Sequence, residues 1–188
     1  MLKIILVAIP VIIVVFLIIV AMQPSVFRVA RSATITAPAE VVFAQVNELK
    51  KWEPWNPWGK IDPAMKLTYE GPASGVGAAY AWVGNNQVGA GRMTTTESRP
   101  NELVRFKLEF YKPMAGVSTA EFTFKPQGYQ TTVTWDMTGK NNFVAKAFCL
   151  FISMEKMIGG QFEQGLADLK TIAEAAAKNQ QASAPTAL

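Results

Sequence analysis

Six short stretches between residues 66 and 138 alternate apolar with polar side chains, and this period of two constrains the fold more than any other feature. Turn-forming sequences rich in Gly, Pro and Asn separate the stretches at short intervals. The pattern predicts an antiparallel meander, with one more strand near the N-terminus. The predicted strands span residues 27–36, 66–70, 77–83, 88–97, 103–111, 117–125 and 131–138.

Successive side chains of a strand point to opposite faces of a sheet, so the alternation sorts the residues into a buried and a solvated face. Charged residues and threonines share the parity that we expect to face solvent. The inward parity holds aromatic and aliphatic side chains and two alanines: Leu67, Tyr69, Ala78, Tyr80, Trp82, Val104, Phe106, Leu108, Phe110, Ala120, Phe122, Phe124, Val133, Trp135 and Met137.

Two further segments have the period of a helix. Pro38 suits a first helical turn, and apolar residues follow it up to Trp52. From Phe143 to Lys178, apolar residues recur every three or four positions. We expect a break at Gly159-Gly160, because a glycine costs about 1 kcal/mol in a helix interior. Residues 179–188 are predicted to be a disordered tail.

The N-terminal segment from Ile4 to Met22 contains no charged residue and is almost entirely aliphatic. A helix of about 20 apolar residues spans the ~30 Å hydrocarbon layer of a bilayer. We therefore predict a transmembrane anchor over residues 1–24 and a single-pass protein of a bacterial inner membrane, with the side of the globular domain left open. The alternative is a cleaved signal peptide, whose apolar core is shorter, about 7–15 residues.

The composition excludes several functional classes. Histidine is absent, which removes imidazole as a base or metal ligand, and the single Cys149 lies in an apolar helical run. We expect no metal and no cofactor. The net charge is +4, but the basic residues are scattered and form no stripe for nucleic acid.

A rigid aromatic loop is predicted at residues 52–58, which hold two prolines and three of the five tryptophans. One interpretation is that Trp52, Trp55 and Trp58 gate a cavity mouth or touch a bilayer. The other is that they fill the gap between helix and sheet.

These elements pack most economically as a curved sheet around the last helix, which makes the chain an α+β protein. The order of five segments along the chain resembles that of the SRPBCC superfamily. The segments are the early strand leading into Ala37–Phe43, the tryptophan loop, Tyr69-Glu70-Gly71, Thr132–Trp135 and Gln161–Lys170. Its members are helix-grip proteins related to START and Bet v 1 domains and to bacterial polyketide cyclases. The resemblance implies a hydrophobic ligand cavity in a domain over residues 25–178, without a shared catalytic residue.

We interpret the protein first as a membrane-anchored module that binds a hydrophobic or lipid-like small molecule. Two alternatives stay open: a cyclase- or hydrolase-type enzyme that uses cavity tyrosines or carboxylates, and a membrane-tethered protein-interaction module. Each of the candidate ligand-binding residues has an inward parity, and each is also explained by core packing. They are Tyr69, Tyr80, Trp82, Phe106, Phe122 and Trp135.

Overall fold

A computed structural model describes residues 2–151 and 153–183, with side chains from residue 9 onward. Seven strands form one antiparallel sheet in the order β1-β7-β6-β5-β4-β3-β2. The seven strands predicted from the alternation are all present, which confirms the α+β class. Their bounds are β1 (Val26–Ile35), β2 (Lys66–Glu70), β3 (Ala79–Val83), β4 (Ala90–Arg99), β5 (Leu103–Lys112), β6 (Gly116–Gln127) and β7 (Gln130–Lys140).

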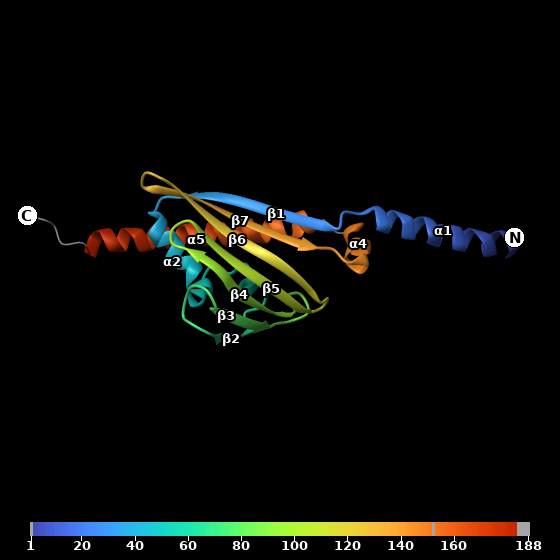
Figure 1. Ribbon diagram of the computed structural model, residues 1–188, viewed down its shortest axis with the longest axis horizontal. Coiled ribbons are helices and arrows are strands. Elements are labelled where there is room, and N and C mark those ends of the chain that lie inside the picture. Colours follow the sequence, from blue (N-terminus) through green and yellow to red (C-terminus); the bar gives the residue numbers. More distant parts are fainter. Residues whose placement is uncertain (1, 152, 184–188) are drawn as a thin grey trace, which may run out of the picture.

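Helices lie on one side of the sheet and at its ends (Figure 1). The long α5 packs on β1 and also contacts α2 and α3, while α1 projects from the domain beside α4. A curved antiparallel sheet closed around a long C-terminal helix is the helix-grip arrangement. The helices are α1 (Leu2–Met22), α2 (Ala39–Asn47), the 3-10 helix η1 (Leu49–Trp52), α3 (Pro57–Ile61), α4 (Phe143–Cys149) and α5 (Met154–Ser183).

The inner face of the sheet carries the parity predicted from the sequence. Phe122 on β6 lies opposite Val104 on β5 and Trp135 on β7. The next inward row places Ala120 between Phe106 and Met137. All these side chains are buried, and they form one hydrophobic core with α2, η1 and α5.

The predicted helix break at Gly159-Gly160 is wrong, because α5 begins at Met154 and runs through both glycines. Gly159 is instead the place where a side chain of β1 crosses the helix. Arg31 donates hydrogen bonds to Glu155 and Glu163, which lie one turn to either side of Gly159, at 2.5 Å each. A Cβ on Gly159 would lie 2.7 Å from Arg31 Cζ.

We expect Gly160→Ala to stabilise the protein more than Gly159→Ala. Gly160 has nothing within 4 Å of an added Cβ, so alanine should stabilise the helix by about 1 kcal/mol. At Gly159 part of this gain is lost, because Arg31 must move and give up its ion pairs with Glu155 and Glu163. In an Arg31→Ala background, Gly159→Ala should become as stabilising as Gly160→Ala. Urea unfolding of the cycle measures this, and equal effects in both backgrounds would contradict it.

The prediction of a transmembrane anchor at residues 4–22, and with it of a single-pass membrane localisation, is wrong. A membrane-crossing helix needs about 20 apolar residues in succession. Within the described residues, no helix combines the length and the apolar character that such a crossing requires.

Two local predictions also differ from the structure. The tryptophan loop is not irregular throughout, because Asn56 Oδ1 accepts a hydrogen bond from Trp58 N and Pro57 begins the short α3. At the C-terminus, α5 continues to Ser183, into the segment predicted as a disordered tail. The remainder of that segment, residues 184–188, lies outside the described residues.

Candidate functional site

The space between the sheet and α5 holds a deep aromatic cluster built around Trp135. This indole stacks on Phe162 of α5, with ring centroids 4.0 Å apart and planes at 10°. The ring of Phe122, on the neighbouring strand β6, lies 4.7 Å from the Trp135 ring between centroids. Phe106 is 6.2 Å from Phe122, so three of the six predicted ligand-binding residues meet here. Their side chains are almost completely buried.

The other three predicted residues form a second cluster toward the β2 edge of the sheet. Tyr80 lies 6.0 Å from Tyr69 and 6.0 Å from Trp82, measured between ring centroids. Trp82 in turn contacts Phe110 edge to face at 5.8 Å. The structure therefore brings the six candidates together on one sheet face, but in two neighbouring groups.

Trp52 and Trp55 complete the deep cluster and were not among the predicted ligand-binding residues. Their rings are 4.3 Å apart, and both pack against Phe122 and Trp135. Both side chains are buried, as the gap-filling interpretation of the loop requires. The spacing of the tryptophans at every third residue was a usable indication, because an aromatic segment beside an apolar sheet face contributes to the same interior.

The indole N–H groups of these tryptophans differ in their hydrogen bonding. Trp52 Nε1 donates to Val46 O at 2.8 Å, which holds its indole in place. The Nε1 atoms of Trp55 and Trp135 and the Oγ1 atom of Thr95 are buried and find no hydrogen-bond partner in the described part of the chain. A buried polar group left unpaired costs about 1–3 kcal/mol. Three unpaired polar groups in the interior between the sheet and the helices therefore need an explanation.

A surface hollow of about 270 Å³ lies at the β2 edge of the sheet. Leu49 of η1 and Tyr69 of β2 line it, and η1 also supplies Trp52 to the deep cluster. Tyr69 donates a hydrogen bond to Glu53 Oε1 at 3.0 Å, which ties the sheet edge to the tryptophan loop. We call this hollow the mouth.

The two tyrosines near the mouth are hydrogen-bond donors at neutral pH. Burial and the neighbouring Glu53 carboxylate together raise the pKa of Tyr69 to about 12. Burial also raises the pKa of Tyr80 above its ordinary value. Neither phenol is therefore poised to act as a base at neutral pH.

The C-terminal end of α3, downstream of Trp55, is held by two contacts. Lys60 Nζ forms an ion pair with Asp168 Oδ2 of α5 at 2.5 Å. Just beyond α3, Asp62 Oδ2 accepts a hydrogen bond from Asn85 N at 2.6 Å, in the turn between β3 and β4. The Trp55 indole makes no hydrogen bond to the described residues and is held by packing.

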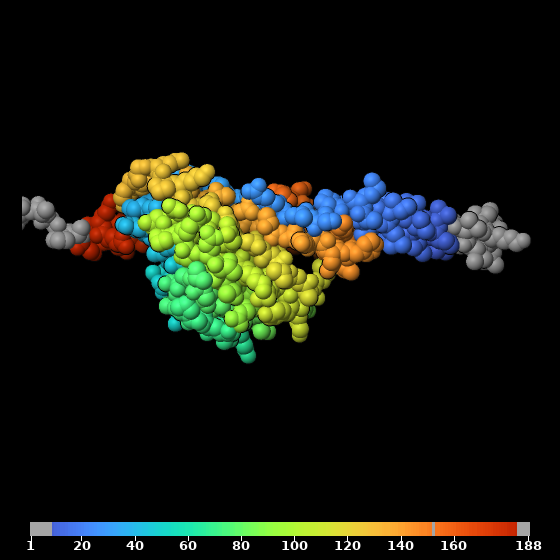
Figure 2. Space-filling view, viewed as in Figure 1, coloured from blue at the N-terminus to red at the C-terminus, as the bar shows by residue number. Residues whose placement is uncertain are grey.

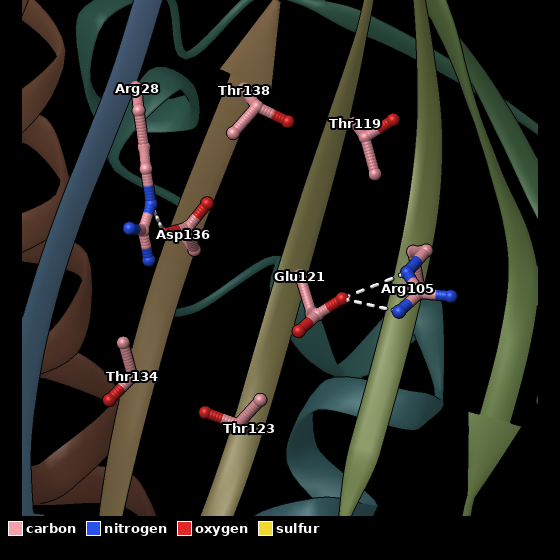
Figure 3. A pocket seen from close by; sticks show the side chains of 8 residues that line it. All are labelled: Arg28, Arg105, Thr119, Glu121, Thr123, Thr134, Asp136 and Thr138. Carbon is pink, nitrogen blue, oxygen red and sulfur yellow. Dashed lines mark hydrogen bonds and ion pairs between the residues drawn. The ribbon is translucent and has the colours of Figure 1, made fainter.

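A larger hollow of about 360 Å³ lies on the opposite, solvated face of the sheet (Figure 3). Threonine hydroxyls and charged groups line it, and the charges are paired: Arg28 with Asp136, and Arg105 with Glu121. The charged side chains of this solvated sheet face are therefore paired with partners on neighbouring strands. Within the described residues, no three His, Cys, Asp or Glu side chains lie together as a metal site would need.

Apolar side chains are also exposed on α4, which lies at the base of α1 (Figure 2). Phe143, Val144 and Phe148 are exposed, and Phe151, just beyond the helix, is 80% exposed. Clustered apolar exposure of this kind marks interaction surfaces on many proteins.

Comparison with known proteins identifies the family. The sequence profile of the family described as polyketide cyclase/dehydrase and lipid transport matches residues 26–174. The match spans most of the chain and covers both aromatic clusters. The chain belongs to this family. Membership places it in the SRPBCC superfamily that the sequence motifs resemble. Among curated proteins, none shows significant sequence similarity to it.

Solved structures share the fold of this polyketide cyclase/dehydrase family member at low sequence identity. A protein from Thermus thermophilus is 19% identical, with a TM-score of 0.60 over 80% of this chain and 99% of that chain. The Aha1 dimer from Colwellia psychrerythraea is 16% identical, with a TM-score of 0.57 over 79% and 96%. A protein from the dynemicin biosynthetic locus, DynU16, is 14% identical, with a TM-score of 0.54 over 80% and 48%.

Proposed function

We propose that this protein binds an apolar small molecule between the sheet and α5, with entry through the mouth at Tyr69. The observation that carries the proposal is Trp55, a buried indole whose N–H has no acceptor among the described residues. It lies two residues after Glu53, which accepts the hydrogen bond of Tyr69 at the mouth. The family description, which names cyclases, dehydrases and lipid transport, supports an apolar ligand as well.

The aromatic side chains fill the interior, so a ligand has to take the place of one of them. Trp55 is the side chain best suited to leave. Its N–H gains a hydrogen bond to water on exposure, and this offsets part of the cost of exposing its ring. Trp52 would lose its bond to Val46 O and is expected to stay. The predicted residues Tyr69, Tyr80, Trp82, Phe106, Phe122 and Trp135 then form the proposed walls.

The test uses the full chain and the apolar fluorescent probe N-phenyl-1-naphthylamine. We expect its fluorescence to rise on binding, with energy transfer from tryptophan. Tyr69→Phe removes the hydrogen bond to Glu53 across the mouth and should speed probe association several-fold. Tyr111→Phe, on the exposed face of β5, is the matched control and should leave the rate unchanged.

Two more variants locate the probe. Ala73 is exposed and lines the mouth, so Ala73→Trp should block entry. Phe148→Ser removes part of the exposed apolar surface on α4 and should not affect uptake. Binding that is lost with Phe148→Ser and retained with Ala73→Trp would contradict the proposal, as would an absence of binding.

Protein interaction is the second candidate function, favoured by the exposed apolar side chains of α4 and by an interior that its own residues fill. Failure of the probe to enter the wild-type protein would make it the better-supported of the two.

A further inference from the structure

We infer that the bound molecule carries an oxygen acceptor, of the ketone, ester or ether class, and that this oxygen receives the hydrogen bond of Trp135 Nε1. The inference rests on the proposed function and adds the chemical class of the ligand. Its basis is the unpartnered N–H of a side chain that cannot turn away to find an acceptor.

Trp135 is held more firmly than Trp55. It lies on β7, a strand with hydrogen-bonded neighbours on both sides. Its indole is stacked on Phe162 and flanked by Phe122 and Trp58. A Cβ on Gly165 would lie 2.9 Å from Trp135 Cζ3, so α5 approaches the ring closely. The N–H therefore has a fixed direction, and only an incoming group can satisfy it.

The Trp55 indole lies 6.0 Å from that of Trp135, measured between ring centroids. Departure of Trp55 would therefore vacate space beside Trp135. A ligand that enters this space meets aromatic rings and an indole donor. A pure hydrocarbon would leave the donor unpaired, whereas a carbonyl or ether oxygen would pair it.

Ionised ligands are disfavoured by the same surroundings. The nearest basic side chain on the inner parity of β1 and β7 is Arg31, and its guanidinium already binds Glu155 and Glu163. A carboxylate beside Trp135 would be desolvated without a counter-cation. The ligand group that pairs with Trp135 Nε1 must therefore be a neutral acceptor.

The experiment compares two probes of nearly the same shape, fluorene and fluorenone, which differ by the carbonyl group. We expect fluorenone to bind the full chain about two- to tenfold more tightly after correction for water–octanol partition, the range for one net hydrogen bond. Trp135→Phe should remove this preference. Trp52→Phe is the matched control and should keep it, because the Trp52 N–H is already bonded to Val46 O.

An infrared measurement does not depend on any variant folding. The carbonyl stretch of fluorenone bound to wild-type protein should shift to lower frequency than in an apolar solvent. Equal affinity for the two probes, together with an unshifted carbonyl band, would overturn the acceptor inference and leave the proposed function standing. If neither probe binds, the proposed function itself fails and the inference fails with it.

Discussion

Gly91→Ala should destabilise the protein by about 3 kcal/mol, at the upper end of what overpacking a core usually costs. Gly91 lies on the inward face of β4, opposite Trp82 on β3. An added Cβ would lie 2.5 Å from both Trp82 Cη2 and Glu109 O. The Glu109 oxygen belongs to the backbone of the β4–β5 ladder and cannot move easily. The Trp82 indole must also leave its place over the glycine.

Urea unfolding measures this effect, with Gly116→Ala as the control. Gly116 starts β6 and has nothing within 4 Å of an added Cβ. Alanine there should be neutral or stabilise by about 0.4–1 kcal/mol through the unfolded chain. Because Trp82 also contacts Phe110, the Gly91 variant should lose part of its near-ultraviolet circular dichroism as well. A loss of stability no larger than that of Gly116→Ala would show that Trp82 does not depend on this glycine.

Phe162→Ala should cost about 3–5 kcal/mol, the usual range for a buried phenylalanine. Phe162 is fully buried on α5 and stacks on Trp135, so its removal takes away a ring contact between the helix and the centre of the sheet. The matched control is Phe151→Ala. That side chain is 80% exposed and should change the stability by less than about 0.5 kcal/mol.

The same variant also reports on the interior. Truncation of Phe162 leaves an apolar space beside Trp135, and spaces of this kind accept benzene. Added benzene should therefore raise the unfolding midpoint of Phe162→Ala more than that of the wild type. A small loss of stability without any effect of benzene would mean that the surroundings collapse onto the vacated site.

The sheet could be predicted from local sequence patterns, because the alternation within a strand is enough to show which of its side chains face the core. Phe106, Phe122 and Trp135 have the inward parity in the sequence, and the cross-strand registers place them on the inner face. The order of the motifs from the early strand to Lys170 likewise led to the right superfamily, since each motif marks one element of the helix-grip arrangement.

Other features depend on residues that meet only in the folded chain. The two glycines at 159 and 160 look alike in sequence, and both lower helix propensity. Only the structure shows that Arg31, from the first strand, crosses the helix at Gly159, while Gly160 faces open space. The apolar run at residues 4–22 likewise predicted an anchor, which the described residues do not support.

The candidate site divides in the same way. The alternation and the composition were enough to predict that aromatic side chains line one face of a sheet and that a tryptophan-rich loop lies next to it, because both are local properties. Whether these rings leave a space or fill it was decided by the packing of Trp52, Trp55 and Phe162 against Trp135. The isolation of the Trp55 and Trp135 donors was decided there too. The surroundings of these two donors come from distant segments of the chain, and they exist only once α5 has closed on the sheet.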